Sequence, residues 1–89
     1  MVVKTTKRFD REIEKLPAYL RDKVILWVEF VETLGLREVR KRPGFHDEPL
    51  KGERKGQRSV RLNQSYRLIY LELREEKEIL ISEVSRHEY

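Results

Sequence analysis

The spacing of apolar residues changes once along this chain, and the change limits which folds the chain can adopt. Between Phe9 and Leu34, apolar residues recur every three or four positions, as on one face of an α-helix. Between Ser59 and Val84, they form short β-rich runs separated by turn residues. Helices that precede a group of strands predict an α+β domain, in which the helices cover one face of an antiparallel sheet.

Two helices are expected in the first half. Thr6 is a candidate N-cap for the first helix. Proline is disfavoured inside a helix but favoured at its first position, so the first helix should end near Leu16 and the second should begin at Pro17. Gly35 is suited to end the second helix, and the two helices then form a hairpin. Val2–Thr5 is short and carries a lysine, which predicts an edge strand.

Three further strands are expected, at residues 59–62, 66–71 and 78–84, and they should form an antiparallel meander. The predicted order is β-α-α-β-β-β, with the helical hairpin packed on a mainly antiparallel four-stranded sheet. The hairpin covers only one face of this sheet. The other face is therefore the expected binding surface.

The segment from Leu36 to Gly56 has no hydrophobic period and is interrupted by prolines and glycines. It is too long to be a simple connection in so small a domain. We therefore expect it to be either a functional loop or a disordered segment.

The composition limits which classes of function and of binding site are possible. The 89 residues fit a single domain spanning residues 1–89, and 40% of them are charged with a net charge of +4, which suits a polyanionic partner. The absence of cysteine excludes disulfides and thiolate zinc sites, and the two histidines have no metal-ligand spacing, so no metal or cofactor is expected. No signal peptide or membrane-length apolar run is present, which predicts a cytoplasmic protein without membrane contact.

Arg67 lies within the most apolar strand and alternates in phase with Ile69 and Leu71. Charged side chains are rarely buried unless they are paired. Arg67 therefore either binds a structural carboxylate or meets an anion on the open face of the sheet. We favour the anion, because Arg58 and Arg61 on the preceding strand would add to the same positive field.

The remaining polar residues complete the chemistry of RNA cleavage. In that reaction a base deprotonates the 2′-hydroxyl, an acid protonates the leaving 5′-oxygen, and cations hold the phosphate. Glu48 or His87 is a candidate base, and His87 or Tyr89 a candidate acid. Arg67 and Arg61 would hold the phosphate. The glycine-rich loop adds basic residues that either bind the RNA backbone or are simply solvated: Lys51, Arg54, Lys55 and Arg58.

The motif "EPLKGERKGQRSVRLNQSYRLIYLE" and the ending "RHEY" resemble the toxins of the RelE/ParE superfamily, especially its YoeB-like and HigB-like branches. The "FDR" and "KLP" elements also fit, so the resemblance covers nearly the whole chain. It implies a RelE-like microbial RNase-type fold. It also implies a toxin of a type II toxin-antitoxin system that cleaves messenger RNA in the ribosomal A site without a metal.

The resemblance assigns roles to individual residues. Glu48 corresponds to a general base, Arg67 to a phosphate-binding arginine, and Tyr89 to the final tyrosine. The family pattern places histidine immediately before that tyrosine, whereas Glu88 stands there and His87 lies one residue earlier. A shift of one residue along a strand turns a side chain to the opposite face. The resemblance therefore does not decide which of His87, Glu88 and Tyr89 is the general acid. RNA-facing basic positions correspond to Lys51, Arg54, Lys55, Arg58 and Arg61.

The resemblance also implies partners. A cognate antitoxin would wrap the toxin and block its site, and the complex, rather than the toxin alone, would bind operator DNA. The ribosome and messenger RNA would be the targets. The resemblance does not decide whether the toxin forms a homodimer. Two alternatives remain: a ParE-like toxin that inhibits DNA gyrase, and a toxin that has lost catalysis and only binds its antitoxin. The combination of Glu48, Arg67, His87 and Tyr89 favours RNA cleavage.

Overall fold

The computed structural model describes residues 1–86. Its elements, in chain order, are β1 (Val2–Thr5), α1 (Lys7–Glu14), α2 (Ala18–Leu34), α3 (Leu36–Arg40), the 3-10 turn η1 (Pro43–Phe45), β2 (Glu48–Pro49), the 3-10 turn η2 (Gly52–Arg54), β3 (Gln57–Arg61), β4 (Tyr66–Arg74) and β5 (Glu78–Arg86).

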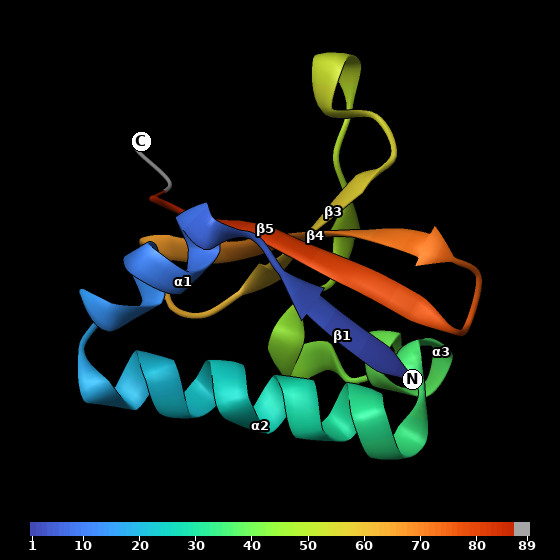
Figure 1. Ribbon diagram of the computed structural model, residues 1–89, viewed down its shortest axis with the longest axis horizontal. Helices are drawn as coiled ribbons and strands as arrows, with labels where there is room; N and C mark the ends of the chain where they lie inside the picture. The colour runs from blue at the N-terminus through green and yellow to red at the C-terminus, as the bar shows by residue number, and fades with distance from the viewer. Residues whose placement is uncertain (87–89) are drawn as a thin grey trace.

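The strands form one sheet in the order β1-β5-β4-β3-β2, with β1 parallel to β5 and every other pair antiparallel. Figure 1 shows α1 and α2 on one side of this sheet. The predicted α+β class and mainly antiparallel sheet are thus confirmed. The sheet has five strands rather than four, because Glu48 and Pro49 pair with Ser59 and Arg58 at its edge.

Local signals set the ends of both long helices as expected. The Thr6 hydroxyl accepts a hydrogen bond from the Phe9 amide at 3.0 Å and caps α1. Pro17 precedes α2, and the Arg21 side chain donates to the Leu16 carbonyl at 2.8 Å, which fixes the turn between the helices. Gly35 closes α2 at φ +84°, a conformation that other residues rarely adopt.

The core lies between α2 and the sheet. Trp27 is fully buried, and its ring lies 5.1 Å from the Tyr70 ring, so it belongs to the core and not to a base-stacking surface. Each large apolar side chain buried here contributes about 1.5–3 kcal/mol to stability. The buried residues of α2 are Leu20, Val24, Trp27 and Val31, and they pack in one cluster with Val60, Leu68, Tyr70, Ile79 and Ile81.

The segment between α2 and β3 is more ordered than its sequence indicates. It contains α3, whose Leu36 and Val39 are buried, and η1, whose Phe45 is buried. Of the two alternatives predicted for this segment, a functional loop or disorder, disorder does not apply to this part, and the short helix was not expected. Only residues 50–56, which we call the arm, stand out from the body of the molecule (Figure 1).

The helix α1 completes the edge of β5 where β1 ends. The Thr6 hydroxyl donates to the Ser82 carbonyl at 2.6 Å, and the Val84 amide donates to the Glu12 carboxylate at 3.1 Å. Side chains thus replace a neighbouring strand along this stretch. As a result, the start of α1 lies at the border of the sheet face that the helices leave uncovered. Within residues 1–86, no helix is long and apolar enough to span a membrane.

Candidate functional site

The face of the sheet opposite α2, which we call the open face, carries two rows of cross-strand neighbours. Directly paired residues of antiparallel strands project from the same face. Leu68 and Tyr70 face the helices as part of the core, so Arg67 and Ile69, which alternate with them along β4, face the other way. One row on the open face is Arg61, Arg67 and Ser85, and the other is Glu48, Ser59, Ile69 and Glu83.

Arg61 and Arg67 are direct cross-strand partners. Like charges in this position repel each other unless an anion lies between them. Within residues 1–86, neither arginine forms an ion pair. On α2, burial and the nearby charge of Arg61 lower the pKa of Lys23. The arrangement suits an oxyanion bound by two forked guanidinium groups.

Glu48 is exposed on β2 in the neighbouring row of the open face. It lies two strands across and two residues along the sheet from Arg67, which corresponds to about 12 Å at the usual strand spacing and rise per residue. A carboxylate and a guanidinium with this separation can reach different atoms of one nucleotide. Glu48 and Arg67, both candidate site residues, thus lie on the same face of the sheet.

Arg58 lies on the other side of β3 from Arg61, because the two residues are three positions apart along the strand. Its side chain forms an ion pair of 2.5 Å with Asp47, whose side chain is 1% exposed. The Tyr70 hydroxyl donates to the same carboxylate at 2.5 Å, and burial together with Asp47 raises the pKa of Tyr70. Arg58 is thus separated from the predicted RNA-binding group, and its contacts hold the chain next to Glu48.

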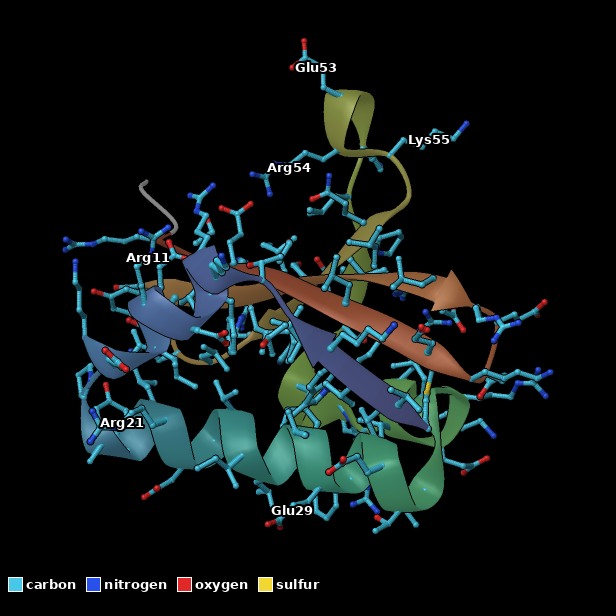
Figure 2. All side chains as sticks on the ribbon, in the orientation of Figure 1. Arg11, Arg21, Glu29, Glu53, Arg54 and Lys55 are labelled. Carbon is cyan, nitrogen blue, oxygen red and sulfur yellow. The ribbon has the colours of Figure 1, made fainter. Side chains whose placement is uncertain are left out.

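The arm carries the remaining predicted basic residues. Lys51, Arg54 and Lys55 are all exposed. In Figure 2, Lys55 and Glu53 point away from the body at the tip of the arm, whereas Arg54 turns back toward α1. Arg54 forms an ion pair of 2.5 Å with Glu83. This ion pair therefore connects the arm to β5 on the open face.

Glu83 and Arg8 are candidate site residues that the sequence does not indicate. In β5, Ile79 and Ile81 face the core, and simple alternation would place Glu83 beside them. The register instead shifts between the pairs Ile69–Glu83 and Tyr70–Ile81, so that Ser82 is an extra residue. This bulge turns Glu83 to the open face, where it also pairs with Arg8 of α1 at 2.8 Å. Nothing in the sequence pattern marks the bulge.

The predicted residues His87 and Tyr89, with Glu88 between them, lie outside the described residues. Before them, Ser85 lies opposite Arg67 and Arg86 lies opposite Tyr66, so β5 carries the chain past the paired arginines. Among residues 1–86, no group of three or more histidine, aspartate or glutamate side chains is placed to hold a metal ion.

Comparison with known proteins agrees with the fold. The family model described as the ParE toxin of the type II toxin-antitoxin system parDE matches residues 3–88. A search of curated protein sequences finds no match.

Solved toxin structures cover the whole domain. The Staphylococcus aureus YoeB dimer superposes with a TM-score of 0.73 at 16% identity, over 100% of this chain and 98% of that one. YafQ from Escherichia coli BL21(DE3) gives 0.65 at 19% identity, over 96% and 91%. The Mycobacterium tuberculosis RelBE2 toxin-antitoxin complex gives 0.62 at 29% identity, over 97% and 96%. At such identities the YoeB and YafQ structures bear on the fold alone.

Proposed function

The chain belongs to the family of ParE toxins of type II toxin-antitoxin systems, and from this membership we propose that it arrests growth by cutting messenger RNA in the ribosomal A site. One observation carries the proposal: Arg61 and Arg67 face each other on the open face, with Glu48 in the adjacent row. Two adjacent arginines beside an exposed carboxylate suit a phosphodiester whose neighbouring hydroxyl must lose a proton.

The proposed reaction uses only side chains and the RNA itself. A base, Glu48 or His87, takes the proton of the 2′-hydroxyl, and the 2′-oxygen attacks the adjacent phosphorus. The bond from phosphorus to the 5′-oxygen breaks, and the 5′-oxygen receives a proton from His87, Glu88 or Tyr89. The products are a 2′,3′-cyclic phosphate and a 5′-hydroxyl. Arg67 and Arg61 stabilise the charge that develops on the phosphoryl oxygens.

The arm extends the proposed RNA-binding surface. Lys51 and Lys55 are exposed on it and free of ion pairs within the described chain, which suits contacts with RNA phosphates. Arg54 reaches the open face itself. Arg58 contributes to the position of the chain around Asp47 and not to RNA contacts.

We further propose the partners that such a toxin needs. A cognate antitoxin covers the open face, and the toxin reaches operator DNA only through that complex. The RelBE2 relative was solved as a toxin-antitoxin complex and the YoeB relative as a dimer, so a homodimer is also compatible with the fold. The site of action is the ribosome in the cytoplasm.

The test is to map RNA ends in cells after the toxin is induced. Primer extension on translated messages is expected to show new 5′ ends within codons in the A site, and these ends should carry a 5′-hydroxyl. The Arg67→Ala variant should give none of them. Intact messages in cells that nevertheless stop growing would contradict the proposal.

A second candidate function follows from the family match itself. The matching model is described as the ParE toxin of the parDE system, and ParE-like toxins were identified above as the gyrase-inhibiting alternative. In that case the basic open face would contact a protein or DNA target. Induced cells would then accumulate gyrase trapped on cleaved DNA while their messages stay intact.

A further inference from the structure

Glu83 lies at the floor of the open face and binds two arginines from two different elements. Glu83 is only 6% exposed. One carboxylate oxygen receives Arg54 of the arm at 2.5 Å, and the other receives Arg8 of α1 at 2.8 Å. The carboxylate thus connects the two sides of the open face, which are far apart in the sequence.

Both arginines keep donors for another anion. A guanidinium has five N–H donors, and each arginine gives Glu83 only one terminal nitrogen. The side chains of Arg8 and Arg54 remain 63% and 45% exposed. Arg8 also contacts Glu12 at 3.4 Å, a long distance for a charged pair, and the other Glu12 oxygen is occupied by the Val84 amide.

The position of this cluster fits a second phosphate of the same strand. The row of Glu83 lies two residues along the sheet from the row of Arg61 and Arg67, about 7 Å at the usual rise per residue. This is comparable with the distance between neighbouring phosphates of an extended RNA chain. A strand whose scissile phosphate lies at the paired arginines would bring an adjacent phosphate over Glu83.

We propose that Glu83 is a positioning residue that holds Arg8 and Arg54 as a second phosphate-binding position for RNA on the open face. This inference rests on the proposed RNA-cleaving function and extends its binding surface to α1. Glu83 itself does not touch the RNA. It repels the phosphate weakly but fixes the two guanidinium groups that bind it.

The direction in which Glu83→Gln changes the affinity for RNA distinguishes this positioning role from an effect of net charge alone. Glu83→Gln and Glu53→Gln each raise the net charge by one from +4. If charge alone mattered, both would strengthen RNA binding. The positioning role instead predicts that Glu83→Gln weakens binding by about fivefold, the scale of one phosphate contact. Glu53, exposed at the tip of the arm and pointing away from the body, serves as the matched control (Figure 2).

The second variant tests the phosphate contact itself. Arg8→Gln should weaken binding by a similar factor and reduce the slope of log affinity against log salt by about 0.7, the value for one contact to single-stranded RNA. Arg11→Gln, one turn further along α1 and exposed, should leave the slope unchanged. Arg8 is exposed, so this variant should fold even if Glu83→Gln does not.

The measurement is fluorescence anisotropy of a labelled single-stranded oligoribonucleotide with 2′-O-methyl groups, which cannot be cleaved, at several salt concentrations. Tighter binding by Glu83→Gln, or an unchanged slope in Arg8→Gln, would overturn the second phosphate position. If Arg67→Ala binds this RNA as well as the unaltered protein does, the proposed function fails and this inference fails with it. Loss of binding in Arg67→Ala with no effect of Arg8→Gln rejects the inference alone.

Discussion

Asp47 is a nearly inaccessible carboxylate that accepts hydrogen bonds from Arg58 and from the Tyr70 hydroxyl. Arg40 of α3 donates in turn to Tyr70 at 3.3 Å and to Glu72 at 3.1 Å. Buried charges are tolerated when they are paired in this way. The network joins α3, β3 and β4 to the residue immediately before Glu48, so it supports the open face from behind.

This network predicts how stability depends on pH. Burial and the adjacent Asp47 raise the pKa of Tyr70 above its ordinary value of 10.0. Above that pH, the unfolded chain loses the tyrosine proton while the folded protein keeps it, so the free energy of unfolding should fall. The expected slope is up to about 1.4 kcal/mol per pH unit.

The Tyr70→Phe variant isolates this contribution from that of the lysines. It should be less stable by about 1 kcal/mol near neutral pH, because the bond to Asp47 is lost. Its stability should decline less steeply than that of the unaltered protein above pH 10.0, the ordinary tyrosine pKa. Urea unfolding at a series of pH values measures both slopes, and parallel slopes would refute the assignment.

Individual residues show where sequence reasoning succeeds and where it fails. The in-strand position of Arg67 predicted its place on the open face, because alternation along β4 is regular between Tyr66 and Ile69. The same alternation places Arg58 and Arg61 on opposite faces of β3, so Arg58 does not add to the positive field around Arg67. Regular alternation does not predict the position of Glu83, because the alternation is interrupted by the bulge at Ser82.

Among the elements, Gly35 between α2 and α3 carries the clearest stability prediction. It adopts φ +84° and ψ 155°, a combination open almost only to glycine. An added Cβ would meet no atom closer than the Glu76 carboxylate at 3.7 Å, so the cost of Gly35→Ala is backbone strain and not a clash. We expect a loss of about 2 kcal/mol.

Gly44 in η1 provides the control. An added Cβ there meets nothing within 4 Å, and its φ is outside the positive range. Gly44→Ala should therefore be neutral or stabilise the protein by up to about 0.5 kcal/mol. Urea midpoints with unchanged m-values would measure both changes. Equal effects of the two substitutions would contradict the strain argument.

Element length decides which parts of the fold are predictable. The helix α2 has 17 residues and a clear start and stop, so its ends follow from Pro17 and Gly35. By contrast, α3 has five residues and β2 has two. Periodicity cannot be recognised over such short stretches. Both are formed by tertiary contacts, which a local pattern does not contain.

At the scale of the whole molecule, RNA cleavage and antitoxin binding should be separable. Arg67→Ala and Tyr89→Ala are each expected to abolish growth arrest, because Arg67 would bind the scissile phosphate and Tyr89 is a candidate acid. Both variants should still retain the antitoxin in a pull-down, since neither change removes a side chain of the described core.

The matched control for these variants is Arg74→Ala. Arg74 is exposed at the far end of the same strand as Arg67. This variant should remain fully toxic. Toxicity that persists in Arg67→Ala and Tyr89→Ala would remove both residues from the site, and loss of the antitoxin complex would indicate misfolding instead.

The fold class followed from the order of helices and strands, because that order leaves few ways to bury both apolar faces. The arrangement of the site followed only in part. The structure places Glu48, Arg61 and Arg67 on one face, whereas Arg58, which the sequence pattern grouped with the two arginines, lies on the other. The pattern also did not indicate Arg8, because contact between the start of α1 and the open face depends on how α1 completes the edge of β5.

The extra residue at Ser82 has a consequence for how this chain tolerates mutation. Deletion of that single residue would restore regular alternation, with Glu83 still on the open face and Val84 still in the core. Substitutions in β5 change one contact each, whereas deletion of a neighbouring residue with the bulge retained would turn the residues beyond it to the opposite face. The last strand therefore tolerates the loss of Ser82 more readily than the loss of a residue beside it.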